Sequence, residues 1–390
     1  MKNTFKDMSL MPLKKKDAIP IFYPHIPRNA INALSKVVSG RWLGQGPLVD
    51  KFEKIFSKKF SDNNKVVAVG SGTDALHLAY ILAGIKKNDE VICPVFTCTA
   101  TNIPLLYMKA NIKFADVDLN NLNISIDHIE KLITKKTKAI VFVNYGGILC
   151  ELEKLQKIAK KHKIILIQDA AQSLGAKYKN KCITNYADFT IFSFQAIKHI
   201  TSGDGGALCL KDNQHYEKAL RIRWFGIDRK KKQNGTWKND IKEIGYKYQL
   251  TDLGACLLLE SIKEFNQIKK HRNLIYKSYL KNINQNKNLR CILSNNKYSD
   301  EVMWLFTIVS PIKDIIQKQL RKKNIETNQV HFRNDKYSIF KKFIKNNKFK
   351  NMDKIHKQYL VLPIHTKMTV KDAEKISEEI NNITAKYDKR

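Results

Sequence analysis

The fold is decided around the segment "KVVAVGSGTDALHLAYILAGIKKNDEVICP", residues 65–94. It opens with the apolar run KVVAV, continues through a glycine-containing turn into the helix-like DALHLAYILAGI, and closes with the apolar run DEVICP. Short apolar runs on either side of an amphipathic stretch are typical of two parallel strands joined by a helix. The segment therefore predicts a strand–helix–strand unit with both strands buried.

The same alternation continues to about residue 210. Further apolar runs separated by helix-like stretches are IKFADV, KAIVFVNY, KIILIQDA, ADFTIFSF and GGALCL. Together they predict an α/β fold with a mainly parallel, seven-stranded sheet covered by helices.

Beyond residue 210 the pattern changes. Residues 228–240 are polar and indicate a mobile loop, and residues 251–283 predict one long helix or a helix pair. A smaller α+β unit is expected to follow, with MWLFTIVS (303–310) and NQVHF (328–332) as strands.

Composition limits the classes of protein. No apolar run reaches the roughly 18–20 residues that span a bilayer, and the chain begins with polar, lysine-rich residues, so we expect a soluble cytoplasmic protein without a membrane partner. The seven cysteines form no repeated CxxC pairs, which argues against a disulfide framework and against a metal site.

The net charge of +34 could serve nucleic-acid binding. However, the lysines are spread along the whole chain, and no zinc finger, recognition helix or aromatic–basic RNA motif accompanies them. We therefore expect no nucleic-acid partner. A basic field would still steer phosphorylated small molecules toward a cleft.

Ligands of parallel sheets bind beyond the carboxyl ends of the strands. Gly72 and Thr73 follow the first apolar run and open a helix, where free backbone amides can cradle a phosphate; a plain glycine-rich cap is the alternative. Asp169 ends the apolar strand KIILIQD, where a carboxylate needs a cationic or hydrogen-bonded partner unless it caps a helix.

The segment SFQAIKHITSGDGG (193–206) supplies Ser193 at a strand end and Lys198 shortly after it. A lysine sheltered by apolar surroundings has a lowered pKa and can form Schiff bases, whereas most lysines are ordinary surface residues. An anion cradle, a strand-end carboxylate and a sheltered amine at one sheet edge are the groups that pyridoxal 5'-phosphate (PLP) requires.

Several stretches carry a resemblance to a known family. They are SGRWLGQGPLVDKFE (39–53), GSGTDALHLA (70–79), CPVFTCTATNIPLLY (93–107), IQDAAQSLGA (167–176), SFQAIKHITSGDGG (193–206), GYKYQLTD (245–252), HFR (331–333) and LPIHTKMT (362–369). In this order and spacing, over roughly residues 18–385, the chain resembles the DegT/DnrJ/StrS family of PLP-dependent nucleotide-sugar aminotransferases.

The resemblance implies PLP-dependent transferase fold type I, which is like that of aspartate aminotransferase. It implies an N-terminal arm (1–20), a large PLP-binding α/β domain (21–265) and a small C-terminal α+β domain (266–390). It also implies a homodimer with shared active sites, in which the segment 245–252 is lent to the partner subunit.

The resemblance further implies roles for single residues. Lys198 and Asp169 are catalytic: Lys198 forms the Schiff base and later shuttles a proton, and Asp169 pairs with the pyridinium nitrogen. Residues expected to contact the cofactor are Gly72, Thr73, Gln172, Ser193, Lys198, Asp169, Lys247 and Cys98.

Two positions depart from the family pattern. Lys247 stands where many relatives have an asparagine that reaches the phosphate, and lysine can contact phosphate as a point charge. Cys98 stands where many have an aromatic residue over the cofactor ring; Phe96 or another residue could take that place.

The residues that we expect to bind the substrate are Trp42, Gln45, Trp224, His331 and Arg333. The alternatives are plain core aromatics for the two tryptophans and surface charge for His331 and Arg333.

The expected reaction moves an amino group from an amino acid, with L-glutamate as donor, to a nucleotide-linked keto-deoxysugar for cell-surface polysaccharide or glycan biosynthesis. Two alternatives remain. Sugar-dehydrating relatives replace the lysine by histidine, whereas this chain keeps Lys198 with His199 beside it. A non-catalytic nucleic-acid-binding regulator would instead exploit the basic surface.

Overall fold

The computed structural model describes residues 18–229, 240–294, 296–344 and 348–388. Its centre is a seven-stranded sheet in the order β1-β9-β8-β5-β4-β2-β3. Strand β9 runs antiparallel to both of its neighbours, and the other pairs are parallel. The predicted fold class is confirmed. The strands are β1 (Lys65–Val69), β2 (Glu90–Pro94), β3 (Asn111–Ala115), β4 (Thr137–Val143), β5 (Ile165–Asp169), β8 (Phe189–Ser193) and β9 (Gly206–Leu210).

Both faces of this sheet are buried. Along β1, Val66 and Ala68 pack into one hydrophobic core, and Val67 and Val69 pack into the other. The strands therefore need apolar residues on both faces, which is why they appear in the sequence as continuous apolar runs. The helices of this unit are α1 (Ala30–Val38), α2 (Pro47–Phe60), α3 (Gly72–Leu82), α4 (Thr99–Tyr107), α5 (Ile126–Leu132), α6 (Leu152–His162) and α7 (Asn213–Ile222).

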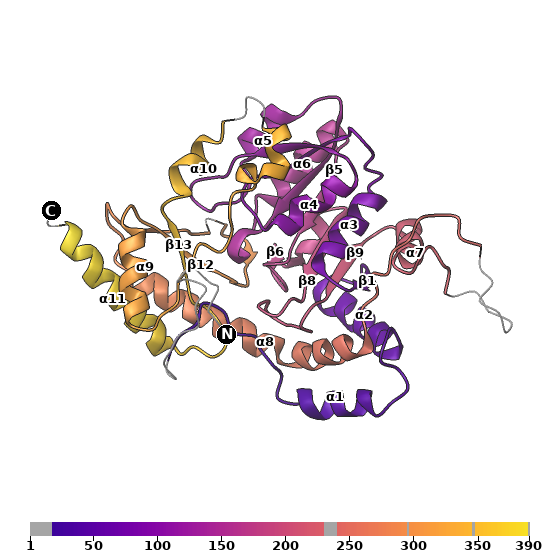
Figure 1. The fold of residues 1–390 in the computed structure, drawn as a ribbon, viewed down its shortest axis with the longest axis horizontal. Helices are drawn as coiled ribbons and strands as arrows, with labels where there is room; N and C mark the ends of the chain where they lie inside the picture. Colours follow the sequence, from indigo (N-terminus) through magenta and orange to yellow (C-terminus); the bar gives the residue numbers. More distant parts are fainter. Residues whose placement is uncertain (1–17, 230–239, 295, 345–347, 389–390) are drawn as a thin grey trace, which may run out of the picture.

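Helix α8 (Asp252–Asn282) links the large sheet to the C-terminal elements (Figure 1). Thr251 caps its start, because the threonine side chain accepts a hydrogen bond from the backbone N–H of Gly254. The helix is unbroken, so the residues expected to form one helix or a pair form one. The proposed domain boundary after residue 265 falls inside α8 and stays a prediction.

The C-terminal unit is built on a small antiparallel sheet, in the order β10-β12-β13. These strands are β10 (Arg290–Cys291), β12 (Phe306–Val309) and β13 (Tyr359–Leu362), and they are accompanied by helices α9 (Lys313–Lys322) and α11 (Val370–Asp388). Strand β12 lies within the predicted run 303–310. Other short elements are β6 (Lys177–Tyr178), β7 (Lys181–Cys182), β11 (Ser299–Asp300), η2 (Tyr145–Gly147), η3 (Ile183–Tyr186), η4 (Asn334–Lys336), η5 (Ser338–Phe343) and α10 (Lys350–Ile355).

The predicted strand at residues 328–332 is wrong. This segment makes an isolated bridge from Asn328 to Val361 and then leaves the small sheet. Its continuation binds the large unit, where Arg333 bridges Phe96 and the backbone N–H of Asn334 donates to the carbonyl of Val95. The segment therefore joins the two units at the carboxyl end of β2.

Two further predictions concern a mobile loop and membrane-spanning segments. Most of the loop predicted to be mobile, residues 230–239, lies outside the described residues. Among the helices in the described part of the chain, none has both the length and the apolar character that crossing a membrane requires.

Candidate active site

The carboxyl edge of the large sheet brings the start of α3 against the end of β8. A side chain on Gly72 would place its Cβ only 2.8 Å from the Cβ of Ser193, so this close approach requires glycine. Ser71 caps α3 by accepting a hydrogen bond from the N–H of Asp74 at 3.0 Å. The N–H groups of Gly72 and Thr73 stay outside the helical hydrogen-bond ladder, which creates a place for an anion beside Ser193.

Asp169 ends β5 at the same edge and is only 5% exposed. Its carboxylate accepts hydrogen bonds from the hydroxyl of Thr101 at 2.7 Å and from the N–H of Ala171 at 3.1 Å. Burial raises the pKa of Asp169, because these two bonds and the charge of Lys198 offset the loss of hydration only in part. The chain continues as turns after Asp169, so the helix-cap alternative is not supported.

Thr101 is a residue that the sequence did not single out for the site. Its hydroxyl lies 2.9 Å from that of Thr97 and donates to Asp169, so the two threonines form a buried hydrogen-bonded chain that ends on the carboxylate. Its only signal in the sequence was its place in the segment that follows β2.

The hydroxyl of Thr101 stabilises the charged carboxylate of Asp169. Replacing Thr101 by valine removes this donor and is therefore expected to raise the pKa of Asp169 further. In the cofactor-free protein this change should cost about 1–2 kcal/mol of stability at neutral pH. The loss should shrink as the pH falls through the pKa of Asp169, since the protonated carboxyl no longer needs the donor. Urea unfolding at several pH values measures it. Thr97→Val, which keeps the direct bond, should have a smaller effect, and equal losses at every pH would contradict the assigned role.

Lys198 lies in the turn after β8 and is half-buried. Exclusion of water by the surrounding protein lowers the pKa of Lys198, and the charges of Asp169 and Cys98 act in the opposite direction. The Nζ atom lies over the ring of Trp304, 3.9 Å from the centroid. The amine is therefore sheltered and easier to deprotonate than a surface lysine.

Gln172 and His331 meet beside these residues. The side-chain oxygen of Gln172 accepts the N–H of Gly146 at 2.7 Å, and its nitrogen lies 3.1 Å from Nε2 of His331. Burial, with a smaller contribution from the charge of Lys198, lowers the pKa of His331 to about 3. His331 is therefore a neutral ring at physiological pH.

Cys98 and Phe96, the two residues considered for the place over the cofactor ring, differ in exposure. Cys98 is exposed at the N-cap of α4. Phe96 is buried, with ring centroids 5.2 Å from Tyr145 and 5.1 Å from Tyr359. Phe96 is therefore a core residue, and it could cover a cofactor ring only by repacking that core.

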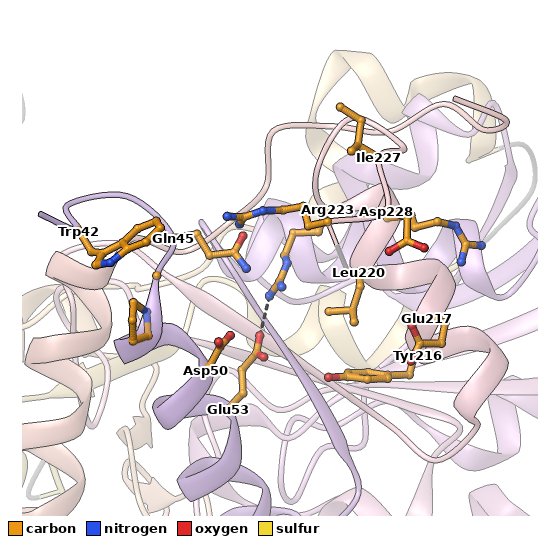
Figure 2. Close-up of a pocket in the computed structure, with 14 residues that line it drawn as sticks. Trp42, Gln45, Asp50, Glu53, Tyr216, Glu217, Leu220, Arg223, Ile227 and Asp228 are labelled. Carbon is orange, nitrogen blue, oxygen red and sulfur yellow. Dashed lines mark hydrogen bonds and ion pairs between the residues drawn. The ribbon is translucent and has the colours of Figure 1, made fainter. Parts of the chain in front are cut away.

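Trp42 and Gln45 lie elsewhere, in the wall of a cavity of about 390 Å³ (Figure 2). Glu53 and Arg223 form a buried ion pair inside this cavity, with Nη1 and Oε1 2.5 Å apart. Trp42 is 48% exposed. Trp42 and Gln45, two of the five predicted substrate residues, thus lie together in a pocket whose lining includes neither Lys198 nor Asp169.

Trp224 and Lys247 face each other across an isolated bridge, and Lys247 is exposed. Arg333, in contrast, is 2% exposed, and its guanidinium binds Asp335 at 2.7 and 2.8 Å and Asp353 at 2.6 Å. These ion pairs engage all three guanidinium nitrogens, and the buried side chain is closed to a substrate anion in this arrangement. The geometry favours a structural role for Arg333 and leaves Lys247 accessible.

The residues at the sheet edge fit PLP. The start of α3 beside Ser193 suits a phosphate, and the incompletely compensated carboxylate of Asp169 suits a protonated pyridine nitrogen. Lys198 supplies a sheltered amine. No group of metal-binding side chains gathers in the part of the chain that the structure describes, and the expectation of no metal stays a prediction. Fold and site together define a PLP-dependent aminotransferase of fold type I.

Comparison with known proteins makes the assignment more specific. The family model of the DegT/DnrJ/EryC1/StrS aminotransferase family matches residues 24–381. The chain belongs to this family, and it is a PLP-dependent sugar aminotransferase.

Two relatives and one solved structure show how similar the chain is to proteins of this kind. The chain is 31% identical to a UDP-4-amino-4,6-dideoxy-N-acetyl-beta-L-altrosamine transaminase of Campylobacter jejuni, covering 95% of this chain and 99% of that protein. It is 30% identical to a GDP-perosamine synthase of Escherichia coli O157:H7, covering 80% and 85%. The crystal structure of AtS13 from Actinomadura melliaura superposes with a TM-score of 0.89 at 26% identity, covering 95% and 100%.

Proposed function

We propose that the protein moves an amino group from an amino acid, with L-glutamate as donor, to a nucleotide-linked keto-deoxysugar that feeds cell-surface polysaccharide or glycan biosynthesis. The observation that carries the proposal is the retained amine of Lys198 at the sheet edge that also holds Asp169. The names of the two relatives, one acting on a UDP-sugar and one making a GDP-sugar, support the substrate class.

Each residue of the site has a defined task in this reaction. Bound PLP supplies an electron sink that acidifies the C–H bond next to the amine under transfer. Asp169 would keep the pyridine nitrogen protonated, and Lys198, whose pKa is lowered by burial, would take up and return the proton as general base and acid. Gly72, Thr73 and Ser193 would hold the phosphate.

Gln172 and Cys98 would adjoin the cofactor ring. The amide of Gln172 is oriented by Gly146 and His331, so it presents a fixed dipole to its surroundings. Exposed Cys98 leaves room where an aromatic ring stands in relatives, which supports a wide pocket.

The proposal includes a homodimer in which exposed Lys247 reaches the phosphate in the site of the partner subunit. Trp42, Gln45, Trp224 and His331 are proposed to contact the nucleotide sugar. For Arg333 we propose a structural role, because Asp335 and Asp353 already bind its guanidinium. The arm (1–20), the large domain (21–265) and the small domain (266–390) are retained as the proposed division of the chain.

A cytoplasmic location is also proposed. All seven cysteines carry free thiols, and six of them are buried, which suits a reducing compartment.

The two alternatives are not favoured. A sugar dehydratase of this family would lack the Schiff-base lysine, and Lys198 is present. A nucleic-acid-binding regulator would need neither a sheltered amine nor a buried carboxylate at the sheet edge.

The test follows the colour of the purified PLP-bound protein. Adding L-glutamate without an acceptor should convert the yellow cofactor to its pyridoxamine form and release one 2-oxoglutarate per site, as ping-pong kinetics require. A panel of UDP-, GDP- and TDP-linked keto-sugars should then restore the yellow form only with the true acceptor. Protein that stays yellow with glutamate and every other amino donor, or that binds nucleic acid tightly and salt-sensitively instead, would overturn the proposal.

A further inference from the structure

Trp304 lies against the lysine of the proposed active site, although it comes from the segment before β12. Its side chain is 1% exposed, and its indole ring lies beneath Nζ of Lys198, 3.9 Å from the ring centroid to the nitrogen. A protonated amine at this distance is attracted to the negative face of the ring, and Trp is the aromatic side chain that attracts cations most strongly.

The indole ring is fixed on several sides. Its Nε1–H donates to the carbonyl of Ile197, the residue directly before the lysine, at 2.9 Å. Phe22 stacks on it with centroids 5.4 Å apart, and His331 lies nearly parallel with centroids 6.2 Å apart. The tryptophan thus holds both the backbone and the amine of the lysine turn.

The same ring belongs to a closed set of contacts around the site. The backbone N–H of Trp304 donates to the carbonyl of Gly146 at 2.8 Å, and the N–H of Gly146 donates to Gln172. Gln172 contacts His331, which lies beside the indole. Trp304 therefore cannot move without disturbing residues proposed to face the cofactor.

We propose that Trp304 is a positioning residue, whose indole face receives the protonated amine of Lys198 whenever the lysine is not bonded to the cofactor. The inference rests on the proposed function, because it gives the lysine a defined place while the amino group is under transfer. A lysine held there returns to the cofactor from one fixed position, without searching many rotamers.

Other groups also act on the amine. The charged or titratable groups that face it are Asp169, Cys98, His331 and His199. Burial lowers the pKa of both histidines, so they stay neutral, and Asp169 is the carboxylate that favours the protonated amine. Trp304 adds a second stabilising contact to the protonated form, so its loss should make the amine easier to deprotonate.

The test measures the reactivity of Lys198 in cofactor-free protein by competitive acetylation at a series of pH values, read by peptide mass spectrometry. Trp304→Leu should shift the profile of Lys198 to lower pH by about 0.4–1.5 units, which is about 3- to 30-fold faster acetylation at a pH below the pKa. Trp304→Phe keeps an aromatic face and should restore most of the wild-type profile.

Phe22→Leu is the matched control, because it removes a neighbouring ring of the same stack and leaves the indole held by its hydrogen bond to Ile197. Its profile should equal that of the wild type. A buried tryptophan can be essential for folding, so circular dichroism checks each variant; if Trp304→Leu does not fold, Trp304→Met against Trp304→Phe makes the same comparison.

An unshifted profile in Trp304→Leu, or an equal shift in Phe22→Leu, would overturn the inference. Neither sugar nor amino donor enters this experiment. A failure here therefore leaves the proposed reaction standing, and a failure to find an acceptor sugar leaves this inference standing.

Discussion

Replacement of Lys198 by alanine is expected to slow the glutamate half-reaction by about 10⁴-fold or more. The structure places this amine in a sheltered position at the sheet edge, with a pKa lowered by burial. Alanine has no group that could remove the proton at the reacting carbon and return it. Single-turnover absorbance with L-glutamate measures the loss directly, because it reports the chemical step and excludes product release.

Two further variants separate this role from a change in charge. Lys198→Arg keeps a positive charge but cannot give a neutral amine near neutral pH, so it should be as slow as the alanine variant. Lys177→Ala removes an exposed lysine from β6 and should leave the rate unchanged. Full transamination by Lys198→Ala would refute the assigned mechanism.

The sheet could be predicted because its strands are buried on both faces and therefore appear in the sequence as continuous apolar runs. The run at residues 65–69 coincides with β1, and that at 89–94 with β2 to within one residue. Asp169 and Ser193 could be placed at one edge for the same reason, since each ends a parallel strand and such ends meet at one side of a sheet. Local periodicity was sufficient for these positions.

Contacts between distant segments could not be predicted in this way. In the sequence Trp304 belongs to a predicted strand, and no local pattern indicates that its ring lies under a lysine more than a hundred positions earlier. Thr101 likewise resembles any polar residue in a helix, although its hydroxyl binds Asp169.

Arg333 illustrates the opposite case. It was expected either to bind the substrate or to be a surface charge, but it is buried, and Asp335 and Asp353, twenty positions away, bind it. The strand expected at residues 328–332 is absent for a related reason, because the following residues pair instead with Val95 and Phe96, directly after β2. Long-range partners decide such positions, and one sequence does not reveal them.

Replacement of Asp169 by asparagine should reduce the glutamate half-reaction by about 10²–10³-fold. A neutral amide cannot hold a positive charge on the pyridine nitrogen, so the electron sink is weakened while the shape of the side chain is kept. The same single-turnover absorbance measurement applies, with the pH dependence of the rate recorded as well.

The stability of the cofactor-free protein should change in the opposite direction. The folded-state pKa of Asp169 is raised by burial, so the charged carboxylate destabilises the fold above that pKa, and the cost disappears as the pH falls below the pKa of the unfolded chain. An asparagine at this position carries no charge to desolvate and can still accept the N–H of Ala171 through its oxygen. Asp169→Asn should therefore stabilise the cofactor-free protein by about 0.5–2 kcal/mol near pH 8, with the gain shrinking toward acid pH.

Urea unfolding of both proteins without cofactor, at several pH values, measures this gain. Asp188→Asn is the matched control, since its exposed carboxylate accepts the N–H of Leu166, a bond that an amide oxygen can also accept. It should change neither stability nor rate. A slower but more stable Asp169→Asn protein would mean that the fold tolerates a buried charge for the sake of the cofactor. A variant that loses stability at every pH would instead identify Asp169 as a structural residue and remove it from the proposed chemistry.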